Sequence, residues 1–546
     1  MTRHPVRRQP VRGPRGLATG WLALVAMAAC DAAPPRRAPS GESMKAGRHG
    51  GTVVAVLGAD PSVLNPDVSV GVPDLFVGCL VYDGLVRFAA GFEIVPALAK
   101  SWEISADGLT YTLHLEEASW HDGEPFTSED VKFTLLEVSA KYGAKFAAAG
   151  RVIERIDTPD ARTAVITLTK PFGPFLFSLA CEQNAAMLPA HTFRDQDILS
   201  HPATRERPVG TGPFRLTEWF RGDHITFERN PSYWRDGEPY LDRIVVSILP
   251  NSSARILALQ AGEVDYINEY YFPLNAYRDL AQDPRFQLQE VSYPSDDLII
   301  LNTKRPPLDR VTVRQALLTA IDRRYLHEVV YFGLGGVGVS SIDSRIAWAH
   351  NPDVNYEEMY PYDPDRARTL LDDAGLPAGT DDTRFSIDLV FDTGRPEQVQ
   401  SAQVIQRFWQ AVGVRVNLEG AERAVVLNRV YTDYDFGGTL QTYTTSGDPA
   451  LGISRLYVTE SIRRGQSFNN ASRYSNPEVD DLFAKGADAP SNTERAVFYH
   501  EVQRILARDL PVLTIHEQVE IDAASTRLRD LFKAANYLWW GSVWLE

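Results

Sequence analysis

Histidine and acidic pairs that could bind a metal occur twice, and both patterns are incomplete. His327-Glu328 and His516-Glu517 begin the motif of a zinc protease, in which a second histidine stands four residues after the first. Tyr331 and Glu520 occupy that position instead. Neither pair therefore predicts a metal site.

Glycine-rich and nucleophile motifs give no catalytic site either. Gly333–Gly338 has the spacing G-x-G-x-x-G, but it follows an expected helix and not a strand, so a flexible or cleft-lining loop fits better than a dinucleotide site. The sequence contains no phosphate-binding loop with its lysine, no G-x-S-x-G turn and no Cys-x-x-Cys pair. We expect no catalytic residue, no metal and no cofactor, and predict that the chain is not an enzyme.

The N-terminus has the layout of an export signal. A basic stretch precedes an apolar run, Leu17–Ala29, which is too short to span a bilayer as a mature helix. Met27-Ala-Ala-Cys30 resembles a bacterial lipobox, in which the cysteine is lipidated and becomes the new N-terminus. We predict a signal peptide over residues 1–29 and a lipid on Cys30. A signal peptide that is cut nearby without lipidation is the alternative.

A tether is expected after Cys30. Residues 30–48 are rich in Pro, Ala, Ser and Gly, a composition that stays extended and would hold a folded body off the membrane. Asp31 resembles the inner-membrane retention signal of enterobacterial lipoproteins. We therefore expect a location in the periplasm or cell envelope, anchored to the inner membrane by the lipid alone.

Length and charge limit the possible partners. The chain has 546 residues, enough for two or three domains, and a formal net charge of −16. Such a surface should repel nucleic acid and anionic lipid headgroups, because both are bound chiefly through Lys and Arg. We expect a monomer that binds no nucleic acid. Cys79 and Cys181 are the cysteines after Cys30; the sequence leaves open whether they form a disulfide or two buried thiols.

The elements alternate between helix and strand. Gly51–Leu57 and Leu109–Leu115 read as strands, and Thr127–Asp130 has capping-box spacing before a helix. Further helices are expected over Thr312–Tyr331, Asp363–Ala374, Gln398–Val412 and Thr493–Arg508, and strands at Val414–Leu418 and Val512–Ile515. The fold class is therefore α/β.

A series of short motifs runs colinearly from about residue 50 to the C-terminus. Its members are Tyr82–Leu85, Pro96–Trp102, Trp120–Thr127, Val209–Phe214, Arg229–Trp234, Leu257–Asp265, Val313–Ala316, Tyr362–Ala367, Tyr474–Asp480 and Asp509–Pro511. Together they resemble the successive signatures of the bacterial extracellular solute-binding proteins of family 5. That family includes dipeptide-, oligopeptide-, nickel- and opine-binding proteins of ABC importers.

The resemblance implies a two-lobed periplasmic binding-protein fold of type II, in its large three-domain form. Lobe 1 would comprise residues 49–82, 209–297 and 516–546, with an accessory domain, 83–208, inserted into it, and lobe 2 would span 298–515. Chain crossings near Ile299–Leu301 and Val512–Ile515 would form a hinge that bends as the lobes close on a ligand.

The resemblance also suggests ligand-binding residues. Asp448 lies in a Gly-Asp-Pro that resembles the segment whose aspartate receives the ligand's α-ammonium in peptide binders, and an Asp-Pro turn is the alternative. Arg395 resembles the arginine that grips the ligand carboxylate in dipeptide binders, with a plain surface arginine as the alternative. Asp60 and Tyr443 are expected to face the cleft.

These residues and this resemblance predict an exported substrate-binding lipoprotein of an ABC importer. It would capture a peptide or peptide-like solute between its lobes and deliver it to membrane permease subunits driven by a cytoplasmic ATPase. The alternatives are a binder of an opine, a sugar or a nickel chelate on the same scaffold, and an extracytoplasmic hydrolase. A sensor or chaperone that keeps the lobes without transport is a further one.

Overall fold

The computed structural model describes residues 48–89, 92–445, 447–532 and 539–546. Cys30, the expected signal peptide and nearly all of the expected tether lie outside the described residues. Residues Gly47–Glu546 form one compact unit. Among the described residues, no helix has both the length and the hydrophobicity needed to cross a membrane.

A long mixed sheet runs through both predicted lobes, and it confirms the expected α/β class. β1 is parallel to β10 and β11, and β14 is parallel to β15 and β16. In spatial order the strands are β15 (Val414–Ala421), β14 (Phe385–Asp392), β16 (Gly438–Thr444), β12 (Phe286–Leu301), β17 (Val512–Ser525), β11 (Tyr266–Ile267), β1 (Thr52–Leu57), β10 (Arg243–Ile248), β9 (His224–Arg229) and β8 (Phe214–Phe220), with β13 (Gly336–Val337) paired to β17.

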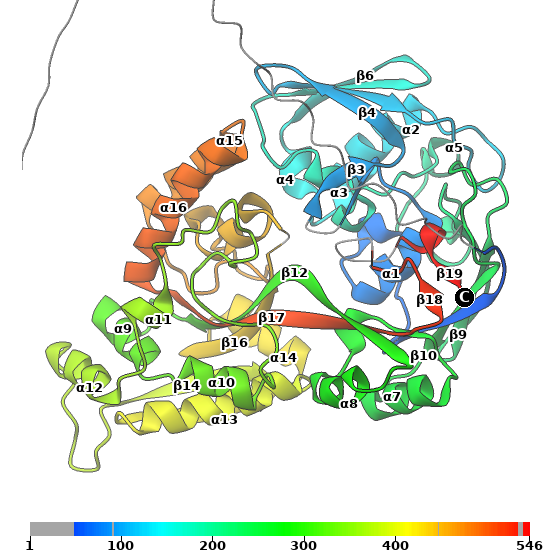
Figure 1. The fold of residues 1–546 in the computed structure, drawn as a ribbon. Coiled ribbons are helices and arrows are strands. Elements are labelled where there is room, and N and C mark those ends of the chain that lie inside the picture. Colours follow the sequence, from blue (N-terminus) through cyan, green and yellow to red (C-terminus); the bar gives the residue numbers. More distant parts are fainter. Residues whose placement is uncertain (1–47, 90–91, 446, 533–538) are drawn as a thin grey trace, which may run out of the picture. The chain divides into compact units, whose positions relative to one another are not determined.

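β12 and β17 are the two strands that connect the halves of this sheet. They pair antiparallel from Phe286 opposite Ser525 to Ile300 opposite Val512, with register shifts between Val291 and Ser295 and next to Asp297. Figure 1 shows them as the long green and red strands that cross the body from the α9 end to the α7 end. The predicted hinge segments therefore pair with each other, while their bending stays a prediction.

Helices cover both faces of the lobe 2 part of the sheet. One apolar core packs against α9 (Val311–Thr319), α10 (Arg323–Val329), α12 (Pro364–Asp373) and α13 (Pro396–Gln410). The other packs against α14 (Arg423–Leu427), α15 (Pro477–Asp488) and α16 (Asn492–Asp509). The expected single helix over 312–331 is wrong. α9 ends at Thr319, and Asp322 starts α10, because its carboxylate accepts a hydrogen bond from the Tyr325 backbone N–H at 2.9 Å.

The accessory-domain residues contain a separate antiparallel sheet with its own apolar core. Its strand order is β4 (Ala99–Ile104), β5 (Thr110–Leu115), β7 (Thr163–Leu168) and β6 (Ile153–Asp160). α2 (Ser128–Phe133) starts with the capping box expected at Thr127, whose backbone N–H donates to Asp130 at 2.8 Å. Shorter elements here are β2 (Val86–Phe88), β3 (Ile94–Pro96), α3 (Ala140–Tyr142), α4 (Ala147–Gly150), α5 (Ala190–Phe193) and α6 (Pro202–Arg205).

The remaining elements belong to the predicted lobes. Predicted lobe 1 adds helices and a two-stranded antiparallel pair near the C-terminus. These are α1 (Val72–Val81), α7 (Ser252–Ala261), α8 (Tyr277–Ala281), β18 (Leu528–Arg529) and β19 (Trp544–Leu545), while lobe 2 adds α11 (Tyr356–Met359).

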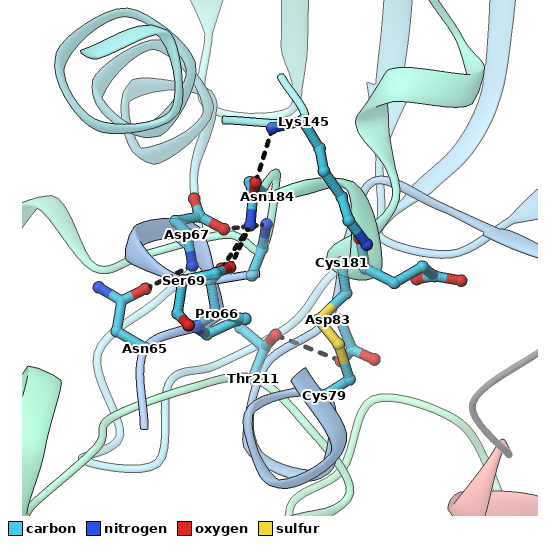
Figure 2. The surroundings of a disulfide bond; sticks show 12 residues. Asn65, Pro66, Asp67, Ser69, Cys79, Asp83, Lys145, Cys181, Asn184 and Thr211 are labelled. Atoms are coloured by element: carbon cyan, nitrogen blue, oxygen red, sulfur yellow. Dashed lines mark hydrogen bonds between the residues drawn. A yellow bond between two sulfur atoms is a disulfide. The ribbon is translucent and has the colours of Figure 1, made fainter. Parts of the chain in front are cut away.

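A disulfide joins the predicted lobe 1 to the predicted accessory domain, which settles the question that the sequence left open. Cys79 of α1 is bonded to Cys181, with their Cα atoms 6.1 Å apart. Figure 2 shows Asn184 beside this bond, where its amide donates to the carbonyls of Pro66 at 2.6 Å and Ser69 at 2.7 Å. The covalent bond and these hydrogen bonds together hold the segment around Cys181 against the turn before α1.

Candidate functional site

Arg395 and Tyr270 face each other between the two predicted lobes. Arg395 is the N-cap of α13 in lobe 2, where Pro396 at the first helical position fixes the start of the helix. Tyr270 lies in the short 3-10 turn Glu269–Tyr271 of lobe 1. The guanidinium carbon of Arg395 is 5.9 Å from the centre of the Tyr270 ring, and Tyr270 is 43% exposed. A guanidinium within about 6 Å of a ring centre is attracted to the face of that ring.

Carboxylates of the crossing strands act on the same arginine. Burial, the largest effect on Arg395, would lower its pKa, but Tyr270, Asp297, Glu397 and Glu520 together raise it above its usual value. Burial raises the pKa of Glu520 to about 6, and Arg395 opposes that rise. The site therefore combines one fixed cation with carboxyl groups that are ready to accept a positive partner.

A second acidic pair, Asp296 and Glu517, lies on the crossing strands beside Arg345. The two residues lie directly opposite each other on β12 and β17. Arg345 cannot neutralise both, since its guanidinium is bonded to Asp343 and to the backbone carbonyls of Gln518 at 2.7 Å and Ser295 at 3.1 Å. Burial and the neighbouring carboxylates Asp343 and Glu517 hold the pKa of Asp296 well above its usual value. Like charges that face each other across a sheet are destabilising without a cation or a proton.

Asp448, the residue expected to receive an ammonium group, is paired inside the protein. Its two carboxylate oxygens accept hydrogen bonds from Nη1 and Nη2 of Arg495 at 2.7 and 2.6 Å. Oδ1 also accepts from the Ala450 backbone N–H at 2.9 Å, which caps the turn at Pro449–Ile453. A ligand ammonium would therefore have to share Asp448 with Arg495, and the ligand role of Asp448 stays a prediction.

Tyr443 and Asp60 also have protein partners. Tyr443 is 1% exposed, and its hydroxyl lies 2.5 Å from that of Tyr431. Asp60 is half-buried and accepts a hydrogen bond from Trp219 Nε1 at 3.0 Å, which ties the loop after β1 to the β8–β9 hairpin. Asp60, Arg395 and the Tyr443–Asp448 region thus have separate sets of contacts. Their contact with a ligand stays a prediction.

Tyr270 was missed in the sequence. The signal that could have identified it is the aromatic run Tyr270-Tyr-Phe272. Two residues separate this run from the end of β11, and it directly follows Glu269. β11 is parallel to β1, and ligands of open α/β sheets bind beyond the carboxyl ends of such strands.

The glycine run and His516, which gave no catalytic or metal motif, have structural roles. The end of the glycine run forms β13 against His516 and Glu517 of β17, where the carbonyl of Glu517 leaves no room for a side chain at Gly335. His516 lies on a strand, stacks on Tyr331 at 3.6 Å and has a pKa lowered by burial to about 3. Within the described residues, no group of three or more His, Cys, Asp or Glu side chains is placed to hold a metal.

Comparison with known proteins gives a consistent result. The model of the bacterial extracellular solute-binding proteins, family 5, matches residues 93–462. Heme-binding protein A of Haemophilus influenzae is 33% identical over 477 residues, which cover 82% of this chain and 84% of the relative. The dipeptide-binding protein of Escherichia coli is 29% identical over 480 residues, or 81% of this chain and 86% of that one.

Solved structures share the fold over nearly the whole described body. DppA of Helicobacter pylori in complex with the peptide STSA superposes with a TM-score of 0.76 at 26% identity, covering 91% of this chain and 99% of that one. AgaA of A. tumefaciens R10 in complex with agropinic acid gives a TM-score of 0.75 at 26% identity, again over 91% and 99% of the two chains.

Proposed function

Because the chain belongs to the bacterial extracellular solute-binding proteins of family 5, which are binding proteins of ABC importers and not enzymes, we propose that its solute is a peptide or a peptide-like zwitterion. The observation that carries this proposal is the placement of Arg395 over Tyr270, beside the carboxylates of Asp297 and Glu520. Arg395 would bind the carboxylate of the solute, and the acidic strands would receive its cation.

The energetics favour such a solute. A charge-assisted hydrogen bond contributes about 1.5–3 kcal/mol net. A bidentate contact with Arg395 therefore discriminates strongly against a solute that lacks the carboxylate. Tyr270 adds an aromatic surface that accepts varied side chains, so the site would select charge and length more than side-chain identity. Scavenging needs a dissociation constant of roughly 1 μM, which is about −8 kcal/mol.

A second candidate is a porphyrin. The relative that is 33% identical over 82% of this chain is named for heme binding, which makes heme a specific alternative to a peptide. An opine remains a third, since AgaA binds agropinic acid on the same fold. Both ligand classes carry carboxylates, so Arg395 would serve them as well.

The protein acts outside the cytoplasm, as binding proteins of ABC importers do. We propose further that the protein is a monomer, that it delivers its solute to permease subunits of the inner membrane, and that a lipid on Cys30 anchors it. The lipobox-like Met27–Cys30 and the tether composition of residues 30–48 support the anchor.

Thermal stabilisation of the purified protein tests the proposed solute. The panel comprises dipeptides to pentapeptides, free amino acids, opines, oligosaccharides, nickel chelates and heme. A ligand at 100 times its dissociation constant adds about 2.7 kcal/mol to the stability of the folded state. We expect stabilisation by short peptides that is lost in Arg395→Ala. Stabilisation by heme or a sugar alone would overturn the assignment of the solute.

A further inference from the structure

Residues 170–177 of the predicted accessory domain contact predicted lobe 2 directly. The backbone N–H of Gly173 donates to the carbonyl of Ala487, near the end of α15, at 2.9 Å. The Lys170 ammonium donates to both carboxylate oxygens of Asp488, at 2.9 and 3.2 Å. Figure 1 shows α15 in orange on the side of lobe 2 that approaches the accessory domain.

Gly173 lies directly on the arginine that holds Asp448. A Cβ atom at position 173 would stand 2.9 Å from Nε of Arg495 and 3.0 Å from its Cδ and Cζ. Arg495 is 2% exposed and is bonded to Asp448, to the Gly486 carbonyl at 2.8 Å and to the Tyr499 hydroxyl at 3.2 Å. Because these bonds fix the guanidinium, it cannot move aside, and only glycine fits this contact.

Apolar side chains complete the contact. Leu451 and Ala487 of lobe 2 pack against the core of the accessory domain. Phe177 stacks on Phe88 inside that core, with ring centres 4.1 Å apart, and points its ring edge at Gly447. The whole contact joins two bodies that are otherwise connected through lobe 1 and the crossing strands.

We propose that residues 170–177 are a latch that holds the accessory domain on lobe 2 when the solute is enclosed. Lys170 and Gly173 are then positioning residues, which set how long the solute is retained without touching it. The inference rests on the proposed function only in that a solute bound between the lobes favours the closed arrangement. The outer part of the latch suits a reversible contact, since Lys170 and Asp488 are 51% and 39% exposed and their charges are solvated when they separate.

Asp448 gains a role from this arrangement. It holds Arg495 in the position on which Gly173 rests, so the Gly-Asp-Pro segment builds the surface that receives the latch. The latch therefore links the accessory domain to a residue pair that includes Asp448, which the sequence alone would assign to the ligand.

The test is a distance measurement by electron paramagnetic resonance between spin labels on Glu154→Cys of the accessory domain and Val497→Cys of lobe 2. Both positions are exposed. The exported chain carries Cys30→Ser and keeps its native disulfide. Distances are recorded as purified and with saturating Met-Leu dipeptide. The latch variants are Gly173→Val, Lys170→Asp, and the exchanged pair Lys170→Asp with Asp488→Lys.

We expect a short-distance population in the otherwise native chain that Gly173→Val removes. Lys170→Asp should reduce it by about 2- to 5-fold, as the loss of an exposed ion pair predicts, and the exchanged pair should restore it. The exchanged pair keeps the test valid if Gly173→Val fails to fold. Identical distances in all variants, or the absence of the short population under both conditions, would overturn the latch. The distances are also measured without added peptide. If the protein binds no peptide, the variants therefore still test the latch independently of the proposed solute.

Discussion

Replacing Asp448 by alanine separates a structural role for this residue from a ligand-binding one. The substitution leaves the buried Arg495 guanidinium without its carboxylate partner, although hydrogen bonds to Gly486 and Tyr499 remain. Removing one partner of a buried ion pair costs about 3–5 kcal/mol, because the other charge stays buried. Each kcal/mol shifts the midpoint of a domain the size of lobe 2 by roughly 2–4 °C. The ligand-free protein should therefore melt roughly 6–20 °C lower.

Calorimetry of the ligand-free protein measures this effect. Asp448→Asn is the matched control, since it keeps the shape of the side chain and removes only the charge, and it should fall between the wild type and Asp448→Ala. Adding Arg495→Met to Asp448→Ala should recover part of the loss, because the unpaired charge is gone. An unchanged melting temperature for Asp448→Ala, with weaker peptide binding, would refute this reasoning and support a direct contact with the ligand ammonium.

Further predictions follow from the other contacts. Arg395→Ala should weaken peptide binding by about 1.5–3 kcal/mol in titration calorimetry; equal binding would argue against a carboxylate contact. Reducing the bond between Cys79 and Cys181 should lower the first thermal transition, since the bond closes a loop of 102 residues and contributes at most about 5 kcal/mol. The pKa of Glu520 is raised from 4.5 to about 6, so its contribution favours the folded state below pH 4.5 and is lost as the pH rises through 6. Glu520→Gln should therefore stabilise the ligand-free protein more at pH 7 than at pH 5 in thermal melts. Cys30→Ala should move the protein from the membrane pellet to the soluble envelope fraction; unchanged pelleting would exclude a lipid anchor.

Much of the fold follows from local signals in the sequence. The capping residues Thr127 and Asp363 start helices in the structure, since a side chain that satisfies the first backbone N–H groups acts within a few residues. The wrong prediction of one continuous helix over 312–331 has the same origin. The apolar pattern continues through 312–331, but a second capping residue inside it restarts the helix.

The candidate site was less predictable, because its partners come from distant parts of the chain. Asp448 and Arg495 are 47 residues apart, and no local pattern marks arginine as the partner of that aspartate. Tyr270 meets Arg395 only because two lobes bring them together. The resemblance to the family indicated Arg395, whereas Tyr270 and the latch around Gly173 needed the three-dimensional arrangement.

The most direct test of the proposed carboxylate contact compares a dipeptide with its C-terminal amide by titration calorimetry, in the wild type and in Arg395→Ala. If Arg395 binds the solute carboxylate, the wild type binds the free dipeptide at least about tenfold more tightly than the amide, and Arg395→Ala binds both equally weakly. Equal binding of the two ligands by the wild type, or the same preference in Arg395→Ala, would contradict it.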